Sequence, residues 1–223
     1  MGGREYGSVA YWEARYDPDR AEELVGHALT EDEVARAAAF DWYCDYDDIR
    51  DELLKVLEDE ELSQLRVFVP GCGNSAVSFE AAEDFGHVLS VDFSPTCIRK
   101  MSELAETKGL SDKCVFQVAD VTDCSHLGTF DVVLDKGTFD AVLCSEECET
   151  AAAKMMWEMH KMLRPGGFMV VCTHGSPDRR LGLFRGEDMP PMPKWNDDIY
   201  QARAGNFHFY ALRKPATCTL PSS

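Results

Sequence analysis

The chain has two patterns of apolar residues, and the change between them falls near Leu65. Beyond it, short runs rich in β-branched and aromatic residues predict strands over 66–69, 87–91, 114–118, 130–134 and 168–173. The longer stretches between them have apolar residues at helical spacing and predict helices over 75–84, 94–108 and 148–163. Strands that alternate with helices and are apolar throughout form parallel sheets covered on both faces. The pattern therefore predicts an α/β fold with a doubly wound core.

Both ends of the chain depart from this alternation. Before the first strand, residues 20–36 are charged and alanine-rich, and residues 45–58 place their apolar side chains on one helical face. Both segments are therefore expected to be helices. At the other end, residues 198–203 and 206–213 have strand character and are separated by Ala204-Gly205. A tight connection of this kind predicts an antiparallel pair that closes the edge of the sheet.

Together these elements predict a mostly parallel seven-stranded sheet whose last strand is antiparallel, in a Rossmann-like arrangement. The length of 223 residues suits one domain with appendages better than two independent domains. We therefore expect a single domain over residues 1–223, with 1–60 as an N-terminal helical cap and 61–223 as the core.

Charge restricts the partners that suit this protein. Asp and Glu total 40 against 22 Lys and Arg, which gives a net charge of −18 at pH 7. Proteins that bind nucleic acid without sequence preference place Lys and Arg against the phosphates, so this composition disfavours direct nucleic-acid binding. A basic protein or a small molecule is the expected partner.

The cysteines indicate a compartment. There are 9 of them, an odd number at irregular spacing, which disfavours a disulfide framework and favours the reducing cytoplasm. Cys144 and Cys148 lack the paired spacing of a zinc site, so no metal is expected. No stretch is apolar enough to span a membrane, and no anchoring signal is expected at either end. We expect a cytoplasmic monomer.

The first candidate for ligand binding is the glycine-rich turn after the first strand. Gly71 and Gly73 stand between that strand and a helix, where glycine permits a tight turn and lets a ligand approach the backbone. The same residues, with Ala76, also fit a dinucleotide-binding fingerprint. An ordinary strand-to-helix turn is the structural alternative.

Acidic residues follow the next two strands. Asp92 comes at the end of the second strand, where a carboxylate accepts hydrogen bonds from both ribose hydroxyls of an adenosine-type cofactor. The alternative role of Asp92 is that of a helix N-cap. Asp120 and Val121 end the third, where a carboxylate and a backbone amide can recognise the edge of an adenine ring. Three such strand ends in succession favour a nucleoside-containing cofactor.

The fourth strand runs into Asp135-Lys136-Gly137-Thr138, and with this segment the series resembles the class I S-adenosylmethionine-dependent methyltransferases. A narrower resemblance is carried by residues 11–16, 40–43, 71–75, 133–138 and 206–209. Together these segments are similar to the lysine methyltransferases of translation elongation factor 1-alpha, including the one related to the N-terminal region of an endothelin-converting enzyme isoform.

The resemblance implies that S-adenosyl-L-methionine is the cofactor and assigns its contacts. Gly71 and Gly73 would line the methionine moiety, Asp92 would hold the ribose, Phe93 would lie against the adenine, and Asp120 with Val121 would recognise it. Aromatic N-terminal segments would cover the cofactor, and Lys136 would add a contact. The aromatic residues assigned to this pocket are Trp12, Tyr16 and Trp42, and the additional contact is Lys136.

The activity implied is methylation of a protein lysine, with elongation factor 1-alpha or a similar basic protein as partner. Asp135 is the implied catalytic residue, close to the transferred methyl group and able to orient the ammonium. His174 and His208 are lone histidines, for which a structural role is the more common one, and a place at the border of the substrate entrance is the alternative that their positions leave open. The motif of DNA and amide methyltransferases, Asn or Asp followed by Pro-Pro and an aromatic, is absent after the fourth strand.

Three other functions remain open on the sequence. The superfold has many small-molecule methyltransferases, and fold does not fix substrate. A nicotinamide-dependent oxidoreductase would use the same glycine-rich turn, although it gives no role to Asp120 and Val121. A non-catalytic scaffold that binds the cofactor is the third.

Overall fold

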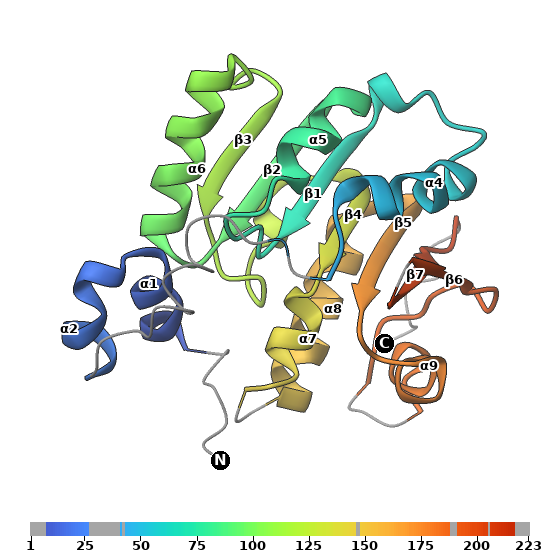
Figure 1. Cartoon of the computed structure of the whole chain (residues 1–223). Helices are drawn as coiled ribbons and strands as arrows, with labels where there is room; N and C mark the ends of the chain where they lie inside the picture. Colours follow the sequence, from blue (N-terminus) through green and yellow to red (C-terminus); the bar gives the residue numbers. More distant parts are fainter. Residues whose placement is uncertain are drawn as a thin grey trace.

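A seven-stranded sheet forms the centre of the computed structural model (Figure 1). The structure describes residues 8–26, 41, 43–145, 148–187, 191–204 and 206–216. In spatial order the strands run β3-β2-β1-β4-β5-β7-β6. Their bounds are β1 Arg66–Pro70, β2 His87–Asp92, β3 Cys114–Val118, β4 Phe130–Lys136, β5 Leu163–Thr173, β6 Tyr200–Ala204 and β7 Phe207–Arg213.

The strand directions confirm the predicted fold class. β1 to β5 are parallel to one another, whereas β7 is antiparallel to both β5 and β6. The C-terminal hairpin therefore enters the sheet with its second strand, so that β7 pairs with β5 and β6 forms the edge. The register places Val170 opposite Ala211 and Val171 opposite Tyr210.

Helices cover both faces of the sheet. The bounds are α1 Val9–Tyr16, α2 Ala21–Val25, α4 Tyr46–Val56, α5 Val77–Asp84, α6 Pro95–Lys108, α7 Thr138–Val142, α8 Cys148–Met162 and α9 Pro177–Arg185. One buried cluster joins α4, α5 and α6 to the sheet, and a second joins α7, α8 and α9 to its other face. Successive residues of β4 alternate between them, with Val132 and Leu134 in the first cluster and Val133 in the second. This is why the middle of β4 has apolar residues at successive positions, from Val132 to Leu134.

Some elements differ from the sequence expectation. The helix expected over 20–36 is present as a 3-10 turn and α2, while residues 27–36 lie outside the described part of the chain. α9 was not predicted, because only Phe184 of that helix is buried and the chain there has little apolar periodicity. β5 begins at Leu163 rather than at residue 168, since Leu163 pairs with Phe130 ahead of an irregularity in the ladder.

The N-terminal helix is attached to the core through polar contacts with α6, beside which it lies in Figure 1. The Glu13 carboxylate accepts hydrogen bonds from the Ser94 and Thr96 hydroxyls, the latter at 2.7 Å. Anionic groups are stabilised at this position because the N-terminus of a helix carries partial positive charge. Lys100 Nζ donates to the carbonyl of Tyr16 at 2.5 Å. These contacts hold α1 beside the carboxyl ends of the strands.

No helix among the described residues has the length and apolar character needed to cross a membrane.

Candidate functional site

A cavity of about 490 Å³ lies at the carboxyl ends of β1, β2, β3 and β4. β2 and β4 lie on opposite sides of β1 and reverse the strand order there, which is where ligands bind in open α/β sheets. The cavity brings together most of the residues predicted to bind a cofactor: Trp12, Tyr16, Gly71, Gly73, Asp92, Phe93, Asp120, Val121 and Lys136.

The glycine-rich turn forms the floor of this cavity. Gly71 and Gly73 have φ values of 57° and 53°, in the left-handed region that favours glycine. The Thr138 hydroxyl donates to the carbonyl of Pro70 at 2.8 Å, and a Cβ placed on Gly71 would lie 2.3 Å from that hydroxyl. Glycine is required at position 71 for both conformation and space.

Asp92 joins the turn to the end of β2. Its carboxylate accepts hydrogen bonds from the backbone N–H of Gly73 at 3.0 Å and of Ser94 at 2.9 Å. The N-cap of α6 is Ser94, whose hydroxyl accepts from Cys97, so Asp92 does not have the capping role that the sequence left open. Asp92 is 4% exposed, and this burial raises its pKa to about 6. A buried carboxylate on a cavity wall is suited to accept hydrogen bonds from hydroxyl groups of a ligand.

Asp120 and Val121 line the cavity beyond the end of β3. One Asp120 oxygen accepts from both the backbone N–H and the hydroxyl of Thr122, each at 2.8 Å. This local turn fixes the direction of the carboxylate although the residue is exposed. Recognition of a purine edge by these two residues stays a prediction.

Two aromatic residues of α1 close one side of the cavity. Trp12 and Tyr16 are stacked, with ring centroids 5.8 Å apart and planes at 24°. Tyr16 is 5% exposed, and burial, followed by nearby Asp92, raises its pKa. Both residues line the cavity while they also pack against the core, so core packing is compatible with their predicted cofactor role. Trp42, which was predicted to join them, lies outside the described residues.

Replacing Trp12 by alanine is expected to weaken cofactor binding selectively. The loss of an aromatic face and its buried area corresponds to about a 5- to 30-fold increase in the dissociation constant. Titration calorimetry measures this change, and Trp157→Ala is the matched control because Trp157 lies on α8 and is 39% exposed. If Trp12→Ala abolishes the melting transition and has no effect on cofactor affinity beyond the loss of folding, Trp12 has a purely structural role.

Lys136 lines the cavity at the end of β4 and has a partner that the sequence did not reveal. Its ammonium lies 2.7 Å from a carboxylate oxygen of Asp41, and the Lys136 side chain is only 4% exposed. The Ser75 hydroxyl donates to the same carboxylate. Asp41 therefore connects the segment before α4 to the cavity. The signal was present in the motif over residues 40–43, but nothing in it singled out position 41.

Asp135, the predicted catalytic residue, does not line the cavity. It has no exposed surface, and its carboxylate accepts from the backbone N–H groups of Thr138 at 3.0 Å and Phe139 at 3.2 Å. Burial, followed by the proximity of Asp140, raises its pKa to about 8. The side chain points into the protein because it satisfies the first N–H groups of α7. This location gives Asp135 a structural contact with the start of α7, and its catalytic role stays a prediction.

A second carboxylate, Asp140, lies on the cavity wall in its place. It accepts a hydrogen bond from the Tyr43 hydroxyl at 2.9 Å and forms an ion pair with Arg180 at 2.7 Å. His174 also lines the cavity, whereas His208 is not among the lining residues. Sequence reasoning missed Asp140 and Tyr43 as a pair because 97 positions separate them.

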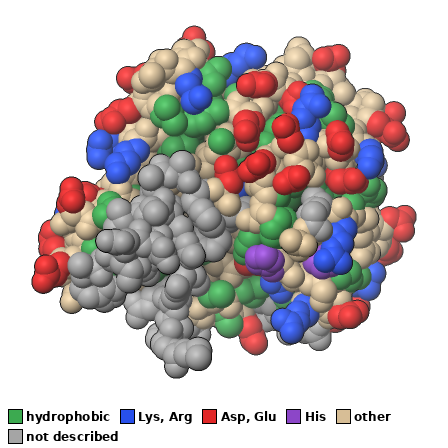
Figure 2. Space-filling model, in the orientation of Figure 1, with side chains coloured by type: hydrophobic (Ala, Val, Ile, Leu, Met, Phe, Trp, Pro, Cys, Tyr) green, Lys and Arg blue, Asp and Glu red, His purple; other side chains and the backbone are tan. Residues whose placement is uncertain are grey.

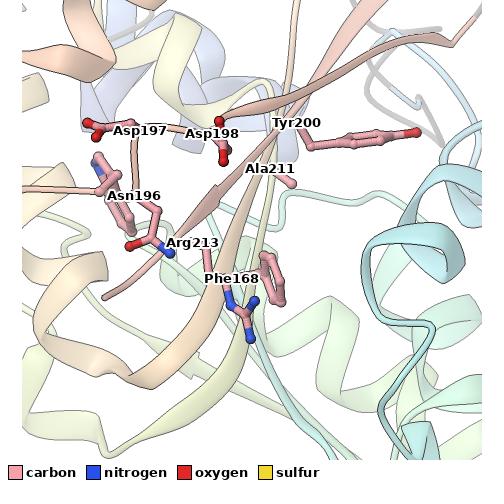
Figure 3. Close-up of a pocket in the computed structure, with 8 residues that line it drawn as sticks. Phe168, Asn196, Asp197, Asp198, Tyr200, Ala211 and Arg213 are labelled. Atoms are coloured by element: carbon pink, nitrogen blue, oxygen red, sulfur yellow. The ribbon is translucent and has the colours of Figure 1, made fainter. Parts of the chain in front are cut away.

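Another cavity, of about 530 Å³, lies away from all of these residues (Figure 3). It is formed where β5, β6 and β7 meet the loop before β6, and Figure 3 shows Arg213 beside Phe168, with Asp197 and Asp198 farther from the Phe168 ring. The Arg213 guanidinium lies 5.1 Å from the centre of the Phe168 ring. In the described part of the chain, no group of three or more His, Cys, Asp or Glu side chains is arranged to hold a metal ion.

Fold and cavity together define the class of protein. The methyltransferase domain family model matches residues 62–202, and the chain belongs to this family. With its antiparallel β7 and its cavity at the strand ends, it is a class I methyltransferase, whose cofactor is S-adenosylmethionine. A solved structure with the same fold is magnesium protoporphyrin IX methyltransferase from Synechocystis PCC 6803 with bound cofactor. The two share a TM-score of 0.56 and 13% identity over 93% of this chain and 97% of that one.

Two relatives of the chain have names that specify the group they methylate. It is 29% identical to EEF1A lysine methyltransferase 4 of Mus musculus over 222 residues, which cover 94% of this chain and 76% of that protein. It is 34% identical to the eEF1A lysine and N-terminal methyltransferase of Homo sapiens over 169 residues, or 74% of this chain. The match covers 21% of that longer protein. The chain is thus a class I methyltransferase related to the EEF1A lysine methyltransferases.

Proposed function

We propose that this protein is a protein-lysine N-methyltransferase that acts on elongation factor 1-alpha or a similar basic protein. The observation that carries the proposal is the near-complete match to a lysine methyltransferase of that factor, over 94% of this chain. The second relative, also named for elongation factor 1-alpha, supports the same substrate. In this proposal, residues 1–60 form a cap on a single-domain, monomeric, cytoplasmic enzyme.

The cavity fits S-adenosylmethionine in size and in the chemistry of its walls. Its volume of about 490 Å³ lies within the usual range for small-ligand sites. We assign the amino-acid end of the cofactor to Gly71 and Gly73, the ribose hydroxyls to Asp92, and the adenine to Phe93, Asp120 and Val121. Trp12, Tyr16 and Lys136 complete the enclosure, and when bound the cofactor supplies an activated methyl group on a sulfonium.

The protein has a limited task in such a transfer. It aligns the acceptor amine with the methyl group, excludes water and allows a proton to leave. Aromatic faces attract cations, so Trp12 and Tyr16 favour a positively charged ligand in the cavity. The proposal requires no metal and no strong base.

The surface charge suits a basic substrate. Figure 2 shows acidic side chains gathered over the region of α4 and α5. The exposed acidic residues there include Asp45, Asp47, Asp48, Asp51 and Glu83. Complementary charge speeds the encounter with a basic protein.

Methyl-labelled cofactor tests the proposal directly. We expect the purified protein to label one band in a cell lysate, and mass spectrometry to place the label on a lysine of elongation factor 1-alpha. An Asp92→Ala protein is the control for dependence on the cofactor site. Label found only on small molecules would replace the proposal by metabolite methylation, and bound cofactor without any transfer would favour a scaffold. Binding of a nicotinamide dinucleotide instead would indicate an oxidoreductase.

A further inference from the structure

Three aromatic rings from distant parts of the chain meet at one end of the cavity. Tyr43 precedes α4, His174 follows β5, and Phe207 begins β7. The Tyr43 ring centre lies 4.1 Å from that of His174 and 5.2 Å from that of Phe207, and His174 and Phe207 are 5.1 Å apart. Tyr43 and His174 line the cavity, and His174 is exposed. The cluster, which we name the aromatic wall, therefore extends from the cavity to the surface.

The wall lies across β1 from the residues assigned to the ribose and the adenine. Asp92 is the last residue of β2 and Asp120 follows β3, and both strands lie on one side of β1 in the strand order. The aromatic wall is attached to the ends of β5 and β7, on the other side of β1. Pro70 and Gly71 at the end of β1 lie between the two regions. A ligand held by the acidic strand ends and a second ligand at the wall would thus meet near the glycine-rich turn.

A single carboxylate fixes the wall. Asp140 accepts hydrogen bonds from the Tyr43 hydroxyl at 2.9 Å, the Thr173 hydroxyl at 2.5 Å and the backbone N–H of His174 at 3.0 Å. Arg180 balances its charge at 2.7 Å, and both of these side chains are at least 86% buried. Two of the three ring-bearing residues therefore have their positions set by Asp140.

The backbone at Tyr43 is also specialised. Its φ of 76° lies in the left-handed region, which is uncommon for a residue with a bulky side chain. The ring packs over Gly137, where a Cβ would lie 3.0 Å from a ring carbon. Strained backbone conformations of this kind concentrate at functional sites.

The chemistry of the wall matches a lysine side chain. Because the Tyr43 hydroxyl donates its proton to Asp140, its oxygen has lone pairs with which to accept a hydrogen bond from an amine. Burial and the proximity of Asp140 raise the pKa of Tyr43 well above its usual value, so the phenol stays neutral. Faces of aromatic rings attract an ammonium group and pack against methylene groups.

We propose that Tyr43, His174 and Phe207 form the binding wall for the acceptor lysine of the protein substrate, with Asp140 as the residue that positions it. This inference rests on the proposed lysine methylation. The lysine side chain enters past His174, packs along the rings, and donates a hydrogen bond from its amine to the Tyr43 oxygen. That hydrogen bond directs the nitrogen toward the cofactor side of the cavity.

Tyr43→Phe tests the wall, and Tyr46→Phe is its matched control. The Tyr46 hydroxyl donates to Asp84 at 2.9 Å, the same distance as in the Tyr43–Asp140 pair, and Tyr46 is not among the cavity-lining residues. We expect Tyr43→Phe to lower kcat for methylation of the protein substrate about tenfold or more. Its calorimetric dissociation constant for S-adenosylmethionine should stay within about twofold of that of the parent protein, and Tyr46→Phe should leave kcat unchanged.

The histidines provide a second comparison. His174→Asn is expected to raise KM for the protein substrate about fivefold. His208→Asn is the control because the His208 ring stacks on Tyr210, at 6.1 Å, and does not line the cavity. Asp140→Asn should partly reproduce both the lower kcat and the higher KM, because it weakens the hydrogen bonds that hold Tyr43 and His174 in place.

The outcomes separate this inference from the function on which it rests. If the parent protein transfers label to lysine and Tyr43→Phe behaves like Tyr46→Phe, the wall has no role in acceptor binding. If Tyr43→Phe loses cofactor affinity and turnover equally, Tyr43 belongs to the cofactor site. If the parent protein binds S-adenosylmethionine and labels no lysine, the proposed function fails and the inference falls with it.

Discussion

Replacing Gly71 by alanine is expected to weaken S-adenosylmethionine binding about 100-fold or more and to lower the free energy of unfolding by about 2 to 4 kcal/mol. Two effects add. The left-handed φ of 57° is strained for any residue with a Cβ, and the new Cβ would lie 2.3 Å from the Thr138 hydroxyl oxygen. Thr138 cannot move away easily, because its hydroxyl is bonded to Pro70 and its backbone N–H to Asp135. The turn must shift, and with it the floor of the cavity.

Gly109→Ala separates these two effects. Gly109 has a φ of 68° at the end of α6, but nothing lies within 4 Å of a Cβ placed on it. It should therefore show only the backbone strain, about 1 kcal/mol, with unchanged cofactor binding. Chemical denaturation and titration calorimetry of the two variants supply the comparison. Equal stability losses, or cofactor affinity preserved in Gly71→Ala, would contradict the steric account of the turn.

The second large effect is expected at Asp92. Asp92→Ala should weaken S-adenosylmethionine binding by about 1.5 to 3 kcal/mol, or about 10- to 150-fold, if its charged hydrogen bonds to the ribose are present. The structure adds a second cause, since the carboxylate also holds the backbone N–H of Gly73 at 3.0 Å. The measurement is calorimetric affinity at pH 7, and an unchanged value would remove Asp92 from the site.

Because Asp92 titrates, the affinity for S-adenosylmethionine is expected to depend on pH. Burial raises its pKa to about 6 in the folded protein without cofactor, and hydroxyl donors from a ribose would lower that pKa by favouring the charged form. Binding below pH 6 must therefore release a proton, so affinity should fall about tenfold between pH 7 and pH 5. Asp92→Asn has no titrating group at this position and should lose most of that dependence. Identical pH profiles for the two proteins would mean that another group is responsible.

The raised pKa of Asp92 makes the stability of the unliganded protein change with pH in the opposite direction to the cofactor affinity. Because the folded-state pKa of about 6 is above the ordinary value of 3.8, folded Asp92 holds its proton more tightly than unfolded Asp92. The unliganded protein therefore loses stability from this residue as pH rises from about 4 through 6. Low pH favours the empty fold, whereas neutral pH favours the bound cofactor.

Residues at strand ends were the most predictable part of the site. Gly71 and Asp120 follow parallel strands and Asp92 ends one, and the carboxyl ends of parallel strands meet at one edge of the sheet. Locating the strands in the sequence was therefore sufficient to expect that these residues meet. All three line the cavity.

Contacts between distant segments were not predictable in this way. Lys136 has an obvious place at the end of β4, yet its pairing with Asp41 spans 95 positions and depends on how the N-terminal segment returns to the sheet. Asp135 and Asp140 illustrate the same limit. Both are acidic and close in sequence, but the first turn of α7 directs one carboxylate inward and leaves the other on the cavity wall. Helical geometry, and not residue type, selects between them.

The sequence by itself determined the sheet, its alternation with helices and the glycine and carboxylate positions at the strand ends, because these depend on local periodicity and on turn chemistry. Tertiary structure alone decided which side chains face the cavity. It brought Tyr43, His174 and Phe207 together near Asp140. It also placed α1 beside the cavity, where Glu13 accepts a hydrogen bond from Thr96 at the start of α6. The physical reason is that these contacts join residues far apart in the chain, whose distances are fixed only when the whole sheet and its helices have packed.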